Sequence, residues 1–130
     1  MNHRRLGLVT IIVPSYNDGI EHFVDDLGFE LVDDTLQDDK RWVVVRPSPA
    51  SETGIVLAEP ATPAQHAALG NQLGGRVGFV LHTDDFARDH ARMRAAGVHF
   101  HEEPRHEPYG IVAVFEDRYG NVWDLLQPGD

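Results

Sequence analysis

The two halves of the 130-residue chain repeat one order of elements, a strand followed by a helix and three more strands. The glycines that end the two predicted helices, Gly28 and Gly97, lie 69 residues apart. Self-similarity at a fixed spacing indicates an internal duplication of a βαβββ unit. The two half-length units must then pack together to make one core. The predicted strands are 6–13, 29–32, 41–46 and 54–58 in the first half and 77–81, 98–101, 111–115 and 122–126 in the second.

Both predicted helices carry apolar residues at helical spacing behind a polar cap. In the first, apolar side chains fall at i, i+3, i+4 and i+7 from Ile20, and Asn17 or Asp18 is expected to cap it. The second helix is expected to begin after Asp84 or Asp85. These patterns place one helix after the first strand of each repeat.

The segment between the repeats is expected to form a short helix at 63–69, because Thr62 and Pro63 suit the cap and the first helical turn. Within the first repeat, the acidic pair Asp33 and Asp34 is expected to form a turn. The predicted boundaries are 6–59 for module one, 60–76 for the connector and 77–127 for module two of a single domain spanning 1–130.

The composition excludes several classes of function. The chain holds 21 Asp and Glu against 11 Lys and Arg, a net charge of −10, and a nucleic-acid partner would require a clustered basic surface. It has no cysteine, which excludes disulfides, thiolate catalysis and Cys-ligated metals. No apolar run approaches the roughly 20 residues needed to span a bilayer. We expect a soluble, cytoplasmic protein with no nucleic-acid or membrane partner.

Two motifs carry a family resemblance: the sequence DLGF at 26–29, where the first helix ends, and FEDRYGNVWDL at 115–125. Together with the repeat, they make residues 6–128 resemble the vicinal oxygen chelate superfamily of glyoxalase I, bleomycin-resistance proteins, fosfomycin-modifying enzymes and extradiol dioxygenases. The family's usual Asp-Pro-Asp-Gly-Asn becomes DRYGN here, with changes at two positions. The resemblance implies an α+β fold with a cup-shaped, mixed and mostly antiparallel sheet, helices outside, a cleft inside and often a homodimer.

Metal-dependent members of the family hold a divalent ion through residues on the first and last strand of each module. The resemblance carries these positions onto Leu8, Leu57, Gly78 and Asp124, with Glu59 replacing Leu57 if the register slips by two. Of the four main positions, only Asp124 can bind a metal, and a catalytic ion needs three or four protein ligands. We therefore expect no family metal site and no cofactor, which disfavours glyoxalase and dioxygenase chemistry by the family's mechanism.

Eight histidines leave a relocated metal site open as an alternative. His82 and His101 each lie two residues before an acidic residue, which on a strand places both side chains on one face. A distant partner such as His99 or His106 would complete a two-His-one-carboxylate set. The alternative function is a metal-dependent lyase, isomerase or dioxygenase that uses His82, Asp124 and one strand histidine.

Asp124 is the most informative single residue in the sequence. It alternates with Trp123 and Leu125, so it faces the cleft if those two face the helices. Asp124 and His106 are the candidate pair for general acid–base catalysis. The simpler interpretation is a solvated carboxylate paired with an arginine, either Arg76 or Arg105.

Other side chains are candidates for contacting a ligand. Trp42 and Tyr109 are expected to supply aromatic walls or, equally, to belong to the core or a dimer interface. Asn71 and Gln72 offer amides in a loop, and His82 lies at a strand end. The leading hypothesis is a metal-independent, homodimeric protein that binds a small organic molecule. A third interpretation is a cleft filled by the protein's own side chains, with dimerisation as the protein's one interaction.

Overall fold

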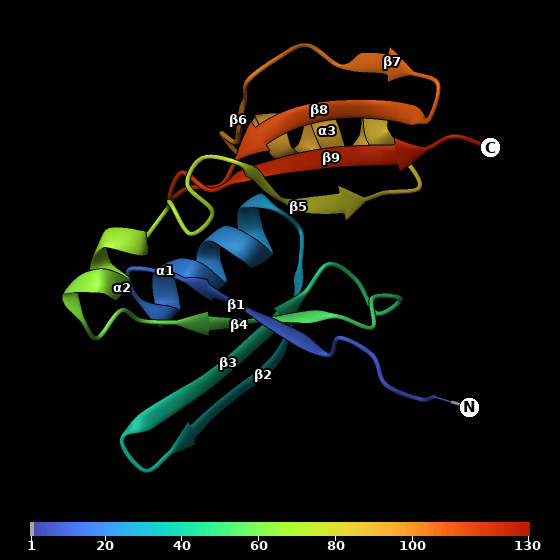
Figure 1. Cartoon of the computed structure of the whole chain (residues 1–130). Helices are drawn as coiled ribbons and strands as arrows, with labels where there is room; N and C mark the ends of the chain where they lie inside the picture. Colours follow the sequence, from blue (N-terminus) through green and yellow to red (C-terminus); the bar gives the residue numbers. More distant parts are fainter. Residues whose placement is uncertain (1) are drawn as a thin grey trace. The chain divides into compact units, whose positions relative to one another are not determined.

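The computed structural model describes residues 2–130. The chain divides into two compact units, and the boundary between them falls between His66 and Ala67 in the sequence. Each unit contains one mixed sheet with few helices, which confirms the predicted α+β class (Figure 1). The elements of the first unit are β1 (Leu8–Ile12), α1 (Tyr16–Ile20), the π-helical turn η1 (Glu21–Asp26), β2 (Glu30–Gln37), β3 (Lys40–Arg46) and β4 (Gly54–Ala58). Those that follow are α2 (Pro63–Ala68), β5 (Val77–His82), α3 (Phe86–Ala95), β6 (His99–Phe100), β7 (Arg105–Glu107), β8 (Gly110–Glu116) and β9 (Val122–Pro128).

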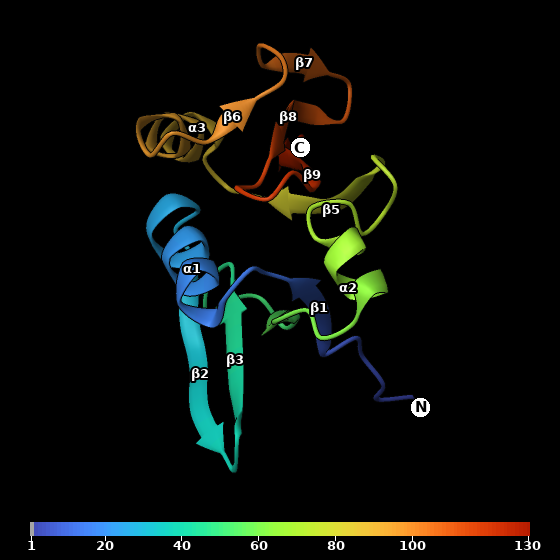
Figure 2. The ribbon, with the colours of Figure 1, turned by 90° about the vertical axis from the view of Figure 1, so that its left-hand side faces the viewer.

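The first sheet has the strand order β1-β4-β3-β2, and only the β1–β4 pair is parallel. Helix α1 lies against one face of this sheet (Figure 2). A Cβ at Gly19 would stand 3.0 Å from side-chain atoms of Leu57 and Val13, so the helix approaches the strands closely. This contact requires a glycine, because a larger side chain would push α1 off the sheet.

The second sheet follows the same plan, with the order β5-β9-β8-β6 and a single parallel pair, β5–β9. Strand β7 also pairs with β8, so β6 and β7 act together as one interrupted strand. A chain of aromatic contacts joins α3 to the sheet. Its rings belong to Phe86, His90, Phe100, Phe115 and Trp123.

Strand β2 is longer than the sequence predicts. The turn expected at Asp33 and Asp34 is wrong, because both residues lie inside β2 and the chain reverses at 38–39. Asp34 is held in the strand by its partner across the hairpin, Arg41, whose guanidinium donates to both carboxylate oxygens at 2.7 and 2.8 Å. A cross-strand ion pair can hold an acidic residue within an exposed hairpin, and the charge pattern of the sequence does not distinguish that arrangement from a turn.

The first helix is capped by Ser15, two or three residues earlier than predicted. Its Oγ accepts from the backbone N–H of Asp18 at 3.1 Å, so the expected caps Asn17 and Asp18 lie inside the first turn. Serine, asparagine and aspartate are all good caps, and the sequence does not reveal which of these residues takes non-helical backbone angles.

No helix in residues 2–130 is long and apolar enough to cross a membrane.

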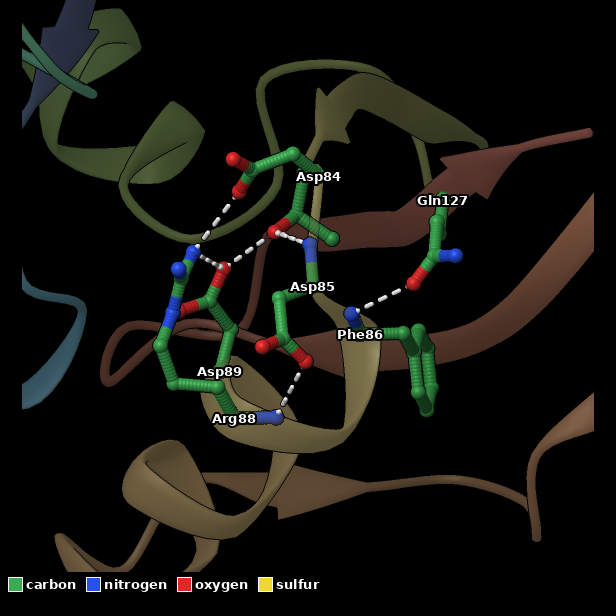
Figure 3. A network of polar contacts seen from close by, with 7 residues as sticks. Asp84, Asp85, Phe86, Arg88, Asp89 and Gln127 are labelled. Carbon is green, nitrogen blue, oxygen red and sulfur yellow. Dashed lines mark hydrogen bonds and ion pairs between the residues drawn. The ribbon is translucent and has the colours of Figure 1, made fainter.

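Helix α3 begins at a network of polar contacts (Figure 3). Of the two predicted caps, Asp85 takes the role and accepts from the Arg88 N–H at 3.1 Å. Gln127 on β9 accepts from the first N–H of the helix at 2.7 Å, which ties α3 to the sheet. The Arg88 guanidinium donates to Asp84 and Asp89, each at 3.0 Å.

The segment predicted as a strand at 98–101 forms only the two-residue β6. Glu102 interrupts the ladder, because its carboxylate accepts the N–H of Val114 at 3.0 Å in place of a backbone carbonyl. Pairing resumes in β7, a strand that the sequence did not predict. Tyr109 lies in the turn between β7 and β8.

The DRYGN motif forms the turn between β8 and β9 around one buried carboxylate. Asp117 is 3% exposed, and its Oδ1 accepts from the backbone N–H groups of Tyr119, Gly120 and Asn121 at 3.0 Å each. Its Oδ2 accepts from Asn121 Nδ2 at 3.0 Å and Trp123 Nε1 at 3.1 Å. The motif that carries the family resemblance therefore has a structural role.

Candidate functional site

Each sheet has a face turned away from its own unit's helix, which we call its distal face. In the second sheet, Trp123 and Leu125 face α3, so the alternating residue Asp124 lies on the distal face. The strand register places Asp124 between Val80 of β5 and Val114 of β8. The register therefore places Asp124 on the face of the sheet away from α3, and its predicted position in a ligand cleft stays a prediction.

The Asp124 carboxylate is incompletely satisfied. Its Oδ1 is buried and has no hydrogen-bond partner in the described part of the chain. Burial raises the pKa of Asp124, the Arg105 charge opposes that shift, and the Glu102 charge adds to it. A desolvated carboxylate oxygen without a donor is costly, and a ligand that supplies an N–H or O–H would relieve the cost.

The charge of Arg105 lowers the pKa of Asp124, and Arg105 is one of the two arginines that the sequence offers as its partner. The hydrogen bonds of Arg105, however, go to other residues. It donates to Glu102 at 2.9 Å and to Glu107 at 2.8 Å. The bond from Arg105 to Glu102 holds the pKa of Glu102 below its ordinary value. The positive charge therefore reaches Asp124 through space and leaves the Asp124 Oδ1 free to accept from another group.

His106 does not meet Asp124 in the structure. It pairs with Ile111 on β7, and by alternation its side chain lies on the opposite face of the sheet from that of its neighbour Arg105. Strand β8 separates β7 from β9, which carries Asp124. The geometry gives no support to an acid–base pair of these two residues.

The relocated metal set is not assembled either. His82 shares the distal face with Asp124, on the neighbouring strand and across from Leu126. His99 on β6 and His101 directly after it lie at the opposite edge of the sheet, three strand spacings away, or roughly 14 Å. His82 therefore cannot join His99 or His101 around one ion.

A different group of potential ligands does come together at that edge. His99, His101 and Glu116 each offer a donor atom, and these atoms lie within 4.8 Å of one another. The sequence singled out the two histidines but missed Glu116, because only the β6–β8 register places it beside them. The sequence signal available was the alternation of side chains along 99–101. It predicts that His99 and His101 share one face, but it does not identify a residue on the neighbouring strand.

The four family metal positions do not fit a metal ion. Leu57 faces α1 and is 1% exposed, while Leu8 is 44% exposed and has no donor atom. Gly78 has no side chain and so offers no donor atom, and the Leu73 side chain occupies the space beside it. Only Asp124 of the four carries a metal-binding group, and one carboxylate does not hold a catalytic ion.

Trp42 lies on the distal face of the first sheet and is 41% exposed, so it is not a core residue. It pairs with Thr35 of β2, whose hydroxyl donates to Asp33 on the same face. An exposed indole beside a hydroxyl and a carboxylate offers both stacking area and polar contacts. This arrangement belongs to the first unit alone.

The loop amides lie at the edge of a very small cavity. Asn71 lines a space of about 10 Å³ together with Leu73, Gly78 and Asn121. The backbone N–H of Gln72 donates to Asn121 Oδ1 at 3.4 Å. A space of this size holds at most one water molecule, so the loop has a structural contact but no room for a ligand at this point.

Comparison with known proteins gives a consistent result. An uncharacterised protein of Shewanella frigidimarina is 48% identical over 124 residues, which cover 94% of this chain and 92% of that protein. The crystal structure of UcmS2 is 30% identical with a TM-score of 0.82, covering 96% of this chain and 98% of that one. TnmS3, described as an antibiotic binding protein from Streptomyces sp. CB03234, is 30% identical with a TM-score of 0.78 and 99% coverage of both chains.

The sequence profile of one family matches residues 5–125, nearly the whole chain. The two repeated units of this chain, each with one parallel pair of strands in a mostly antiparallel sheet, agree with that match. The chain belongs to the Glyoxalase/Bleomycin resistance protein/Dioxygenase superfamily.

Proposed function

We propose that this protein binds a small organic molecule of the antibiotic type without using a metal ion. Two lines of reasoning support the proposal: the similarity to TnmS3, and the absence of ligating groups at three of the four family metal positions. The cytoplasmic location and the homodimer predicted from the sequence belong to this proposal.

Asp124 is the observation that carries the proposal. Its buried, unpartnered Oδ1 is an acceptor on the distal face of the second sheet, among the apolar side chains of Val80 and Val114. Ligand sites combine apolar area with a few polar groups that fix orientation. We infer that the ligand carries an amine or hydroxyl that donates to this oxygen, and the net charge of −10 favours a cationic ligand.

Trp42 offers an independent contact on the first unit. With 41% of its surface exposed, it presents a flat apolar face that a planar ring system would cover. Trp123, the second tryptophan, is 3% exposed and stacks on Phe115. Ligand-dependent changes in fluorescence are therefore expected to come mainly from Trp42, and Trp42→Phe identifies that signal.

The direct test is thermal stabilisation of tag-free protein by metal-free bleomycin, daunorubicin and a library of amine-bearing natural products. A ligand at 100 times its dissociation constant should stabilise the fold by about 2.7 kcal/mol. Asp124→Asn should weaken binding at least about tenfold, because a hydrogen bond to a charged group is worth about 1.5–3 kcal/mol. Asp25→Asn, with the same charge change at an exposed helical position, is the matched control and should bind as the wild type does.

Two results would contradict the proposal. If no compound stabilises the protein, the third interpretation, in which the protein's own side chains fill the cleft, becomes the better one. The second result is that the protein binds metal stoichiometrically after exposure to Zn²⁺, Ni²⁺, Mn²⁺ and Fe²⁺, and that Asp124→Ala does not. That result would favour the metal-dependent lyase, isomerase or dioxygenase, for which elemental analysis is the measurement.

A further inference from the structure

The edge of the second sheet at β6 brings two imidazoles and a carboxylate to one side. His99 lies directly across from Glu116 in the antiparallel β6–β8 pair. His101 is two residues further along, so it returns to the same side, and its N–H still bonds to Val114 of β8. The backbone therefore fixes the positions from which all three side chains extend.

The distances suit a single ion. His101 Nε2 and Glu116 Oε2 are 3.5 Å apart, and all three donor atoms lie within 4.8 Å of one another. Two ligands at the bond lengths of a zinc ion, about 2.0–2.2 Å, stand about 3.3 Å apart in a tetrahedral site. Small rotations of exposed side chains would close the remaining gap without moving the backbone.

The chemistry of the donors points to a particular class of metal. Two imidazoles and one carboxylate form the set that binds zinc and other first-row transition ions, whereas Mg²⁺ and Ca²⁺ prefer oxygen ligands. Three protein ligands leave one or more coordination positions for water or a further ligand. The two histidines line a surface hollow of about 440 Å³, which supplies room for those groups.

The charges around the hollow mostly favour a cation. Glu102 and Glu103 line it beside the histidines, while Arg94 of α3 is the opposing positive charge. Glu102 is partly neutralised by its bond to Arg105 at 2.9 Å. Glu116 therefore remains the acidic group that faces both imidazoles at ligand distance.

We propose that His99, His101 and Glu116 form a binding site for one divalent first-row transition ion, with Zn²⁺ as the probe. This site uses none of the four family positions. Its two histidines lie at the sheet edge, two strands from Asp124, and Glu116 lies on the intervening strand β8. The site is thus compatible with metal-independent ligand binding at Asp124.

The test is metal titration of the tag-free, EDTA-stripped full chain. Calorimetry with Zn²⁺ and the visible spectrum of Co²⁺ should both report one ion per chain, with a cobalt spectrum typical of nitrogen and oxygen ligands. His99→Ala, His101→Ala and Glu116→Gln should each weaken binding at least about tenfold, since even indirect partners of a metal ligand cost 10–100-fold when removed. Melting curves without metal should match the wild type, because the two histidines are exposed and the glutamate is only half-buried.

Two controls separate this site from other sources of metal affinity. His66→Ala removes an exposed histidine on α2, and Asp124→Ala removes the remaining family-position carboxylate. Both variants should bind Zn²⁺ as the wild type does. The proposal is overturned if the His99→Ala/His101→Ala double variant binds Zn²⁺ as well as the wild type, or if the wild type binds no Zn²⁺ at all.

Discussion

The two units share one strand plan, yet their distal faces differ in chemistry. The first sheet presents the exposed indole of Trp42 beside the Asp33 carboxylate and the Glu30–Arg46 ion pair. The second presents Asp124 in its middle and His99 with Glu116 at its edge. A duplicated scaffold thus keeps its hydrogen-bond ladder while its outward positions vary freely, because the ladder is made by the backbone and not by those side chains.

The turns that lead into the last strand of each unit also differ. The β3–β4 connection contains short contacts near the surface, such as Ser48 Oγ accepting from the N–H of Ala50 at 3.2 Å. The β8–β9 turn is built around the buried carboxylate of Asp117, which accepts five hydrogen bonds. The second unit therefore depends on one side chain in a way that the first does not.

The largest expected effect tests that difference. Asp117→Ala would remove the acceptor that Asn121 Nδ2 and Trp123 Nε1 share, and we expect a loss of about 3–5 kcal/mol in the free energy of unfolding. Ser48→Ala, in the exposed turn of the first unit, should cost less than about 0.5 kcal/mol. Urea denaturation of both variants measures the contrast, and equal losses would show that the two turns contribute alike.

A medium effect concerns the two helix starts. Ser15 and Asp85 each accept one backbone N–H at 3.1 Å, so Ser15→Ala and Asp85→Ala should each destabilise by about 1 kcal/mol. The Asp85 change should be the more salt-sensitive, because a carboxylate also interacts with the helix dipole. Thermal melts at low and high salt provide the measurement. A loss near zero for Ser15→Ala would indicate that the π-helical turn holds α1 without its cap.

The smallest expected effect concerns Asp124 and has the opposite sign. Its pKa is raised above the ordinary value of 3.8, so the folded state holds the proton more tightly than the unfolded state does. Ionisation of Asp124 therefore destabilises the fold at neutral pH, and the effect fades as pH falls through the raised pKa and is gone below 3.8. Asp124→Asn should be more stable than the wild type by less than about 1 kcal/mol at pH 7.

The pH profile of that difference is the discriminating measurement. Urea denaturation from pH 7 down to pH 3.5 should show the advantage of Asp124→Asn shrinking with acidity. A variant that is less stable than the wild type at pH 7 would mean that the carboxylate is paired in solution. The expected combination of a more stable fold and weaker ligand binding would mark Asp124 as a residue retained for function at a cost in stability.

Much of the fold could be predicted from local patterns. The β-branched runs that became β3 and β4 and the glycine that ends each predicted helix needed no tertiary information. The errors fell where polar residues decide the outcome through distant partners. Asp34 stays in a strand because Arg41 on the paired strand binds its carboxylate. Glu102 interrupts a strand because its carboxylate, instead of a backbone carbonyl, accepts the N–H of Val114.

The candidate site was less predictable for the same reason. Alternation predicts that Asp124 lies on the opposite face from Trp123 and Leu125, but it could not show that His106 and Asp124 lie on different faces of the sheet. Glu116 was overlooked because it lies 17 positions beyond His99 in the chain and becomes its neighbour only through strand pairing. Register is a tertiary property, and it decides which side chains can share a ligand.

The sequence alone determined the duplicated strand plan and the family. It also showed that three of the four family metal positions carry no metal-binding group, because all three properties depend on residue types at fixed spacings. Tertiary structure decided which polar atoms are left without partners and which are brought together. Asp124 has an unpartnered oxygen because Arg105 is held by two glutamates, and His99 meets Glu116 because two strands pair. Desolvation and proximity arise only when the chain folds, so no one-dimensional pattern contains them.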